Sequence, residues 1–459
     1  MKRIQPLSLV HSLVLAVAWL ASAQAQTNLP AWLVQPLSLA ECIDLALQNN
    51  STILKGKSDL EAAYGLSVQT RAIAIPKVQA TGSYQKSDPD GVETFPEVPA
   101  NIISPFPSLR GDQRWAADVR LVQSIYEGGR ITSALRSARL TREQALLQYQ
   151  TVIADTLLEV RVAYNDVLLA QQQITVQQAS IALLAKELED QKRRFEAGTV
   201  PRFNVLRAEV ELANARPRLI RAKNSYRIAK NNLANLLGYN LPKEVWEDIP
   251  LQLSDHLEEI SFFIELPVAL AKALESRPEL AALRKSVGLT QEAVVVAQAL
   301  WKPSVQVFTG YGSRNSIFSD DLTRDVSGWF AGAQLRWDIF DGLYTKGRIQ
   351  EAKARHRRAE LDLEDNTRRV ELEVRTAYSN FIEAREVLES QKKVQEQAEE
   401  ALRLATVRSE AGTGTQLDVL NAQTALTQAR TTQIEALHDY AVTRARLARA
   451  IGGEQVQPK

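Results

Sequence analysis

The hexapeptide EVRVAY at residues 159–164 returns as EVRTAY at residues 373–378, a shift of 214 residues. The tripeptide AGT at 197–199 returns at 411–413 with the same shift and without a gap. Other pairs at this shift are Trp115 with Trp329, Gly128 with Gly342, Val205 with Val419 and Gly238 with Gly452. A repeat of this length indicates a duplicated domain and not a solenoid of short units. We therefore expect two structurally related halves.

Neither glycine nor proline occurs from Arg130 to Ala197 or from Arg348 to Ala411, which predicts very long helices at 128–198 and 343–411. Leu157, Val160 and Tyr164 follow the spacing of a coiled-coil seam, while Gln and Glu fill the other faces. At 1.5 Å per residue, each long helix would span on the order of 100 Å. Shorter helices are expected at 39–74, 201–237 and 415–451.

Short segments with alternating apolar and polar residues precede each long helix. They predict strands near 77–85 and 115–126 in the first copy, and near 303–312 and 329–340 in the second. The apolar face of the second strand is expected to carry Trp115, Ala117, Val119, Leu121 and Ile125. Strands of about ten residues with aromatic ends are typical of transmembrane barrels, although two hairpins of a soluble sheet fit the alternation alone about as well.

Composition excludes several classes of function. The 55 Lys and Arg residues against 54 Asp and Glu leave a formal net charge of +1, without the basic excess of nucleic-acid-binding proteins. The single cysteine, Cys42, permits no intrachain disulfide, and the four histidines show no paired metal-ligand spacing. Nucleotide-binding and hydrolase motifs are also missing. We expect no enzymatic activity, no cofactor, no metal site and no nucleic-acid partner.

Residues 1–25 have the features of an export signal, with two basic residues, an apolar stretch and a cleavage site after Ala25. No later segment has eighteen consecutive apolar residues. The expected organisation is a signal at 1–25, a first repeat at 26–238, a linker at 239–263, a second repeat at 264–452 and a tail at 453–459.

Four strands cannot enclose a pore, and their unpaired edges would be intolerable in lipid, where every backbone polar group needs a partner. Several chains must therefore share one barrel if these strands cross a membrane. Three copies would supply twelve strands, an even number that lies within the bacterial range and leaves a water-filled lumen.

The chain resembles the TolC-type outer-membrane efflux proteins. The resemblance rests on PLSLAECIDLALQNN at 36–50, on the paired strands, and on the helix turns AGTVPRFNVLRAEVELANAR at 197–216 and AGTGTQLDVLNAQTALTQAR at 411–430. It implies a mostly α fold with a small β part, assembled as a homotrimer with a twelve-stranded transmembrane β-barrel in the outer membrane. A long α-helical tunnel would extend from the barrel into the periplasm.

The resemblance also implies a function and partners. The protein would be the passive exit duct of a tripartite efflux or type I secretion system, joined by a periplasmic adaptor protein to an inner-membrane transporter. The substrate, whether drugs, metal ions or polypeptides, would be selected mainly by that transporter. The alternative is a periplasmic coiled-coil adaptor or scaffold without a pore, for which one hairpin plus a soluble β-domain would be expected.

In the TolC-type family, carboxylates line a constriction at the periplasmic end. The matching positions are Asn204 and Arg207 in the first helix turn, and Asp418 and Asn421 in the second. Because Asn421 stands where many members carry an acid, a ring in a trimer would hold three carboxylates and not six. Gly414 stands where some members carry a bracing arginine, which leaves that contact in doubt here.

Structural roles compete with these functional ones. Thr415 and Asp418 have the spacing of a capping box, which by itself explains an acid at a helix start. The Gly-Thr pairs of the two turns are expected to end helices and also to present the adaptor-binding surface; they are Gly198, Thr199, Gly412 and Thr413. Strand charges expected to face the barrel lumen are Asp118, Arg120, Arg336 and Asp338.

Overall fold

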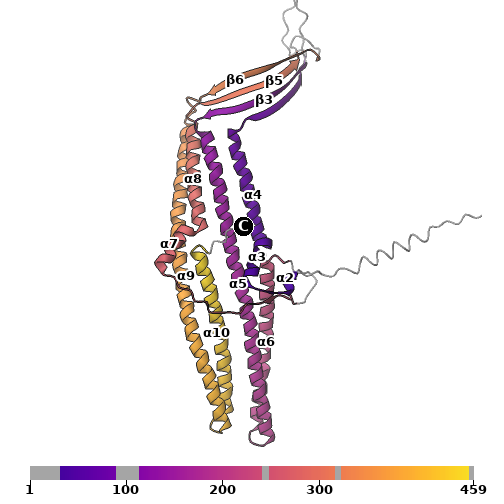
Figure 1. Ribbon diagram of the computed structural model, residues 1–459, viewed down its shortest axis with the longest axis vertical. Coiled ribbons are helices and arrows are strands. Elements are labelled where there is room, and N and C mark those ends of the chain that lie inside the picture. The colour runs from indigo at the N-terminus through magenta and orange to yellow at the C-terminus, as the bar shows by residue number, and fades with distance from the viewer. Residues whose placement is uncertain (1–30, 89–112, 240–247, 316–321, 454–459) are drawn as a thin grey trace, which may run out of the picture. The chain divides into compact units, whose positions relative to one another are not determined.

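The computed structural model describes residues 31–88, 113–239, 248–315 and 322–453 (Figure 1). The expected signal at 1–25, part of the linker and nearly all of the tail lie outside these residues. The described chain forms two compact units, and each unit combines segments from both sequence repeats. Unit 1 lies within 1–50, 157–262 and 380–445, and unit 2 lies within 51–156, 263–379 and 446–459.

The long helices are uninterrupted. Helix α5 (Arg130–Glu196) and helix α9 (Tyr344–Glu410) each contain 67 residues. The stretches without glycine and proline from Arg130 and from Arg348 predict them, and Gly347 lies in the first turn of α9. Helices α6 (Arg202–Leu236) and α10 (Gln416–Ala450) each contain 35 residues. These equal lengths are what a duplication produces. Within the described ranges, we find no helix whose length and apolar content would let it cross a membrane.

The prediction of one helix over 39–74 is wrong. The chain instead forms α3 (Leu39–Asn49), α4 (Ser51–Arg71) and a short 3₁₀ helix at Ala72–Ala74. Asn50 breaks the helix with extended backbone angles, and its side-chain amide donates to the carbonyl of Leu236 at 2.7 Å. The local sequence carries no proline at this point, so the break was not readable from it.

The second copy breaks at the equivalent position. Helix α7 (Leu266–Ser276) ends before Arg277, which is also extended, and α8 (Pro278–Ala299) starts with a proline. Proline disfavours the helical conformation of the residue before it. The two copies therefore share one backbone break but stabilise it by different means.

Four antiparallel strands form the sheet of unit 2 in the order β2-β3-β5-β6. The strands are β2 (Lys77–Lys86), β3 (Gln113–Glu127), β5 (Ser304–Asn315) and β6 (Asp325–Arg336). Strands β3 and β5, which belong to different repeats, pair directly and so join the two hairpins (Figure 1). Strands β2 and β6 form the two edges.

Two details of the strand prediction are corrected. The fourth strand, placed near 329–340, ends at Arg336, because the ladder with β5 stops at Ser304 and the preceding Pro303 has no N–H to donate. Asp338 therefore lies beyond the strand. In β3 a bulge lies between Ser124 and Tyr126, so Ile125 is an inserted residue and Tyr126 takes its place on the apolar face.

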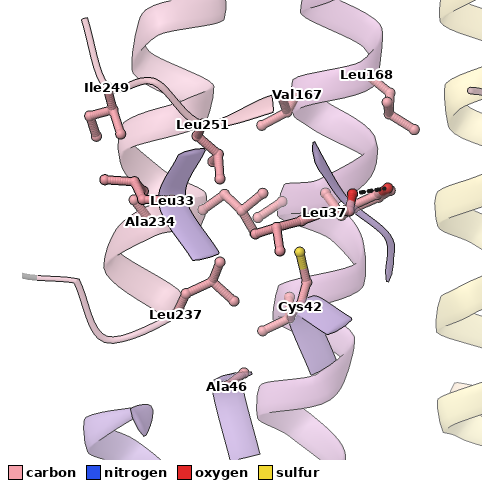
Figure 2. Close-up of a cluster of buried hydrophobic side chains, with 14 of the residues drawn as sticks. Leu33, Leu37, Cys42, Ala46, Val167, Leu168, Ala234, Leu237, Ile249 and Leu251 are labelled. Carbon is pink, nitrogen blue, oxygen red and sulfur yellow. Dashed lines mark hydrogen bonds between the residues drawn. The ribbon is translucent and has the colours of Figure 1, made fainter. Parts of the chain in front are cut away.

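The core of unit 1 gathers short elements around α5 and α6. Strand β1 (Pro36–Leu37) pairs in parallel with β4 (Gln252–Leu253), a small sheet that the sequence did not predict. Figure 2 shows the buried side chains that surround it, from helix α2 (Ala31–Val34), α3, α5, α6 and the segment before β4. Cys42 is fully buried there, and burial raises the pKa of its thiol to about 12.

Two glycines with left-handed backbones close the ends of α6 and α10. Gly238 has a φ of 81°, and a Cβ atom there would lie 2.5 Å from the carbonyl oxygen of Asn49. Gly452 has a φ of 108°, and a Cβ atom there would lie 2.2 Å from Oγ of Ser276. The sequence repeat pairs these two glycines. Each copy therefore requires a residue without a side chain at this point.

Substitution of either glycine by alanine should destabilise the protein. We expect Gly238→Ala and Gly452→Ala each to lower the free energy of unfolding by about 2 kcal/mol, because the added Cβ meets both backbone strain and a steric clash. Thermal unfolding followed by circular dichroism measures the effect. Gly65→Ala in α4 is the control, since that Cβ meets no atom within 4 Å. Equal melting temperatures for all three variants would contradict this account.

Candidate functional site

The α5–α6 and α9–α10 connections in unit 1 have the same geometry. Their key residues are the predicted Gly198, Thr199, Gly412 and Thr413. Both glycines are left-handed, with φ of 71° and 74°. Each threonine donates its N–H and its hydroxyl to the carbonyl five residues earlier, that of Arg194 or Arg408, over 2.8 to 3.2 Å. The prediction that these residues end helices is confirmed, whereas adaptor binding remains a prediction.

Asp418 lies exposed in the first turn of α10 and forms a reciprocal capping box with Thr415. The N–H and hydroxyl of Thr415 donate to Oδ2 of Asp418 at 2.9 and 2.7 Å, and the N–H of Asp418 donates back at 3.3 Å. The backbone N–H of Thr415, followed by its hydroxyl, holds the pKa of Asp418 below its usual value. Asp418 is therefore ionised at neutral pH. The prediction that Asp418 caps α10 is confirmed, and its role in the periplasmic constriction stays a prediction.

The equivalent turn of the first copy is built differently. Asn204 replaces the aspartate, and the N-cap is Pro201, which has neither an N–H nor a hydroxyl to donate. Nε2 of Gln416 donates to the carbonyl of Asn204 at 3.0 Å and joins the two turns. Among the described residues, Arg207 and Asn421 form no side-chain hydrogen bond or ion pair with each other. The structure thus places Asn204 against the start of α10. It shows no such contact between Arg207 and Asn421 among the described residues.

One face of the sheet in unit 2 is apolar and exposed. Cross-strand pairs on this face are Val78 with Leu121, Tyr84 with Trp115, Val119 with Tyr311, Tyr311 with Trp329 and Val305 with Leu335. The side chains of Val78 and Trp329 are 69% and 80% exposed. A contiguous apolar surface of this kind marks contact with a membrane or another protein.

The opposite face carries the predicted strand charges. Asp118 pairs with Thr81 across β2 and β3 and accepts a hydrogen bond from its hydroxyl. The guanidinium of Arg120 lies 4.1 Å from the centre of the Phe308 ring. Arg336, the last residue of β6, shares this face through the alternation along the β5–β6 ladder. A lumen-facing role for these charges remains a prediction.

The tyrosine of EVRVAY holds the small sheet of unit 1. The hydroxyl of Tyr164 lies 2.8 Å from Oδ2 of Asp255 and 3.1 Å from the carbonyl of Leu37. The N–H of Leu39, at the start of α3, also donates to Asp255. Burial would raise the pKa of Asp255, but these hydrogen bonds outweigh it and lower that pKa. The sequence repeat pointed to Tyr164 but gave no signal for Asp255.

A histidine that the sequence reading left without a role joins α10 to α5 in unit 1. Nε2 of His438 lies 2.8 Å from Oδ1 of Asp166, and Nδ1 lies 3.1 Å from Oδ1 of Asp439. Only a doubly protonated imidazole donates to two carboxylates at once. Burial alone would lower the pKa of His438, but these two carboxylates outweigh it and raise the pKa above 6.5.

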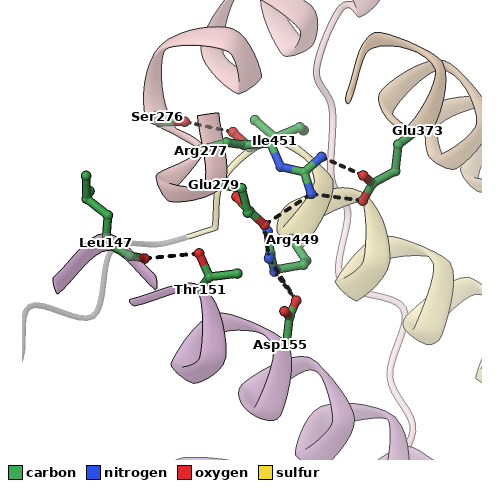
Figure 3. A network of polar contacts seen from close by, with 9 residues as sticks. All are labelled: Leu147, Thr151, Asp155, Ser276, Arg277, Glu279, Glu373, Arg449 and Ile451. Carbon is green, nitrogen blue, oxygen red and sulfur yellow. Dashed lines mark hydrogen bonds and ion pairs between the residues drawn. The ribbon is translucent and has the colours of Figure 1, made fainter. Parts of the chain in front are cut away.

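A polar network in unit 2 fixes the break between α7 and α8 (Figure 3). The buried guanidinium of Arg277 forms two hydrogen bonds, of 2.6 and 3.1 Å, with the carboxylate of Glu373 from EVRTAY. Arg449 of α10 bonds both Asp155 of α5, at 2.8 Å, and Glu279 of α8. The partly buried carboxylate of Glu279 also accepts a hydrogen bond from Arg277, at 3.4 Å, so the network couples α5, α8, α9 and α10 within unit 2.

The His438 contact should make stability depend on pH. Because the folded-state pKa is raised, the contact stabilises fully below pH 6.5 and is lost as the pH rises through the folded value. We expect the melting-temperature difference between the wild type and His438→Gln to be larger at pH 6 than at pH 9. Asp166→Asn should show the same trend. A difference that stays constant across this range would contradict a charged histidine.

Comparison with known proteins agrees with the resemblance read from the sequence. The chain matches the family described as Outer membrane efflux protein over residues 42–239 and 269–453. It is 25% identical over 421 residues to outer membrane protein TolC of Vibrio cholerae, covering 90% of each chain. It is also 25% identical over 419 residues to the alkaline protease secretion protein AprF of Pseudomonas aeruginosa, covering 90% of this chain and 83% of AprF.

A solved structure supports the fold. The outer membrane protein VceC of Vibrio cholerae superposes with a TM-score of 0.72 at 20% identity, covering 90% of this chain and 96% of VceC. At this identity the likeness concerns the fold alone. The family match, in contrast, spans most of the sequence in both repeats. The chain belongs to the outer membrane efflux protein family.

Proposed function

We propose that this chain is one subunit of a homotrimeric, passive exit duct in the outer membrane. The observation that carries the proposal is the sheet of unit 2, which combines an exposed apolar face with two unpaired edge strands. Lipid can cover the apolar face. It cannot satisfy the backbone groups of β2 and β6, which need strands from other copies. Three copies would close a barrel of twelve strands.

Aromatic residues at both ends of the sheet agree with a membrane-spanning height. Tyr84, Trp115 and Trp329 lie toward the end where β2 meets the start of β3, and Trp301 and Trp337 lie at the other end. Trp329 and Trp337 are eight residues apart, or roughly 26 Å in an extended chain. The apolar band of outer-membrane barrels is about 25 Å tall, with aromatic girdles at both edges.

The helices suit an aqueous environment. Each of α5 and α9 would span on the order of 100 Å, with polar residues on much of the surface and no segment apolar enough for lipid among those described. Such helices reach far beyond a membrane about 30 Å thick. We place them in the periplasm, as the wall of a tunnel that continues from the barrel.

The partners follow from this placement. A passive duct needs an energised transporter, and the outer membrane holds no nucleotide supply, so we assign an inner-membrane transporter and a periplasmic adaptor as partners. AprF is named a protease secretion protein, which agrees with a secretion or efflux assembly. We assign adaptor binding to the exposed surface around Gly198, Thr199, Gly412 and Thr413, where each copy presents the same turn geometry. We assign no catalytic role to the chain.

The alternative of a pore-free periplasmic adaptor has less support. An adaptor would be expected to carry one hairpin and a soluble β-domain, whereas this chain carries two long hairpins and four strands of one sheet. The apolar face of that sheet would also be exposed to water in a soluble protein, at a large cost in free energy.

Ion conduction tests the proposed function. Purified protein reconstituted into a planar lipid bilayer should give discrete conductance steps, and the detergent-solubilised protein should be a trimer by light scattering. A membrane-inserted protein without conductance steps under any applied voltage would contradict the duct. A stable monomer in buffer without detergent would favour the soluble alternative.

We assign Asp418 to the periplasmic constriction, together with Asn421, Asn204 and Arg207. Substitutions of the capping box can separate this role from helix capping. Asp418→Asn removes three charges from a trimer at once and should weaken both cation selectivity and block by multivalent cations. Thr415→Val removes the cap but keeps the carboxylate, so it should lower stability and leave selectivity unchanged. If both variants lose stability while neither alters selectivity, Asp418 only caps α10.

A further inference from the structure

The polar face of the four-stranded sheet in unit 2 carries an excess of basic side chains. Within the described strands, the register of the ladders places five basic residues on this face, namely Lys77, Arg114, Arg120, Arg314 and Arg336. Two acidic residues share the face, Asp118 and Glu127. The whole sequence, in contrast, balances 55 basic residues against 54 acidic ones. The basic excess is therefore a local property of this face.

The two acidic residues neutralise little of this charge. Glu127 pairs with Arg130 of α5 at 3.3 Å, and its side chain is only 9% exposed. Its carboxylate is thus compensated by a cation that lies outside the sheet. Asp118 accepts a hydrogen bond from the hydroxyl of Thr81 and, within the described ranges, forms no ion pair with the basic residues of the face.

Most of the basic side chains carry an uncompensated charge. Four of the five form no ion pair with any described residue. The fifth, Arg336, lies 3.4 Å from Asp338, and both of these side chains are more than half exposed. Exposed pairs of this kind contribute little to binding or stability. The positive charge of the face is therefore available to solutes.

Arg120, the central residue of the five, is held by an aromatic ring. Its guanidinium carbon lies 4.1 Å from the centre of the Phe308 ring, and its Nε atom is buried without a hydrogen-bond partner among the described residues. Phe308 lies opposite Gly332, where a Cβ atom would come within 2.8 Å of the ring. A cation–π contact fixes the guanidinium but leaves its charge uncompensated.

The basic residues are distributed along the whole length of the strands. Arg114 lies near the start of β3 and Arg314 near the end of β5, at the sheet end away from the helices. Lys77 is the first residue of β2 and Arg336 the last of β6, at the opposite end. Arg120 lies between, six residues or roughly 20 Å beyond Arg114. A solute that moves along this face meets positive charge at each level.

We propose that the lumen of the barrel attracts anionic solutes and that these five basic residues set the preference. The inference rests on the proposed trimeric duct, in which lipid covers the apolar face of the sheet and the opposite face lines the lumen. Three copies would triple the basic excess around one water-filled space. Rings of charge of one sign select ions of the other sign in pores, and solutes with several negative charges would be favoured most.

The constriction that we assign to Asp418 would act separately from this preference. Asp418 belongs to unit 1, and the sheet belongs to unit 2. Its carboxylate favours cations, whereas the sheet favours anions. The contribution of the sheet is therefore measured best in an Asp418→Asn background, where the acidic constriction no longer masks it.

Ion selectivity tests the inference. In Asp418→Asn protein in a planar bilayer, the reversal potential under a KCl gradient gives the permeability ratio of chloride to potassium. Arg114→Gln with Arg314→Gln should lower this ratio at least about twofold, the scale of a unit charge acting through water on an ion about 10 Å away. Lys77→Gln should lower it too. Lys86→Gln is the matched control, because Lys86 lies on the opposite face of the same strand and its loss should leave the ratio unchanged.

Two variants of Arg120 separate charge from packing. Arg120→Lys keeps the charge and should keep the permeability ratio, whereas Arg120→Gln should lower it. Equal losses in both variants would show that the contact with Phe308, and not the charge, matters at this position, and would remove Arg120 from the proposal.

Salt and a multivalent anion give independent readouts. Raising the salt from about 0.1 M to 1 M shortens the Debye length from about 10 Å to 3 Å, so the preference for chloride should weaken. Inorganic tripolyphosphate at the lower salt should reduce the current more in the Asp418→Asn parent than in the variant that also lacks Arg114 and Arg314. An equal reduction in both proteins would contradict a basic lumen.

The outcomes separate this inference from the proposed function. Discrete conductance steps with a permeability ratio that no lumen substitution changes would overturn the inference and leave the duct standing. The same holds if Lys86→Gln shifts the ratio as much as Lys77→Gln. A membrane-inserted protein without conductance overturns the duct and the inference together.

Discussion

The backbone edges of a four-stranded sheet constrain everything else in this protein. Within the described ranges, strands β3 and β5 are paired on both sides, whereas β2 and β6 are each paired on one side only. The side chains of the sheet add an apolar face that water does not cover favourably. A membrane can cover the apolar face favourably. It makes the unpaired edges of β2 and β6 more costly, because lipid offers no hydrogen bonds. A barrel closed by strands from other copies pairs these edges and keeps the apolar face toward lipid.

The duplication of the chain explains how its two repeats build one sheet with two free edges. Each repeat supplies a hairpin of strands and a hairpin of long helices, yet the compact units combine both repeats. The central β3–β5 pairing and the contact of His438 on α10 with Asp166 on α5 join the repeats within a chain. The outer strands β2 and β6 each keep one edge without a partner among the described residues. A homotrimer would repeat the β3–β5 pairing around a ring, with β2 and β6 of neighbouring subunits as partners.

Periodicity predicted the parts of the fold that depend on long uniform patterns. The stretches without glycine and proline at 130–197 and 348–411 predicted α5 and α9, the two-residue alternation located three strands well, and the Gly-Thr pairs marked the helix ends. Features that depend on one contact with a residue distant in the sequence were not predicted. Asn50 breaks a helix because of a carbonyl 186 residues away, Ile125 is displaced by a bulge, and Asp255 acquires its role only when β4 meets Tyr164. The roles proposed for the constriction and lumen residues would arise only between subunits of the proposed trimer, so neither the sequence pattern nor the fold of one chain fixes them.

Amide hydrogen exchange in the edge strands tests the central claim most directly. In protein reconstituted into lipid vesicles, the N–H groups of β2 and β6 that point away from β3 and β5 should exchange as slowly as those within the β3–β5 ladder, since strands of neighbouring copies hold them. Rapid exchange confined to those outward N–H groups, beside a protected β3–β5 ladder, would contradict a closed assembly.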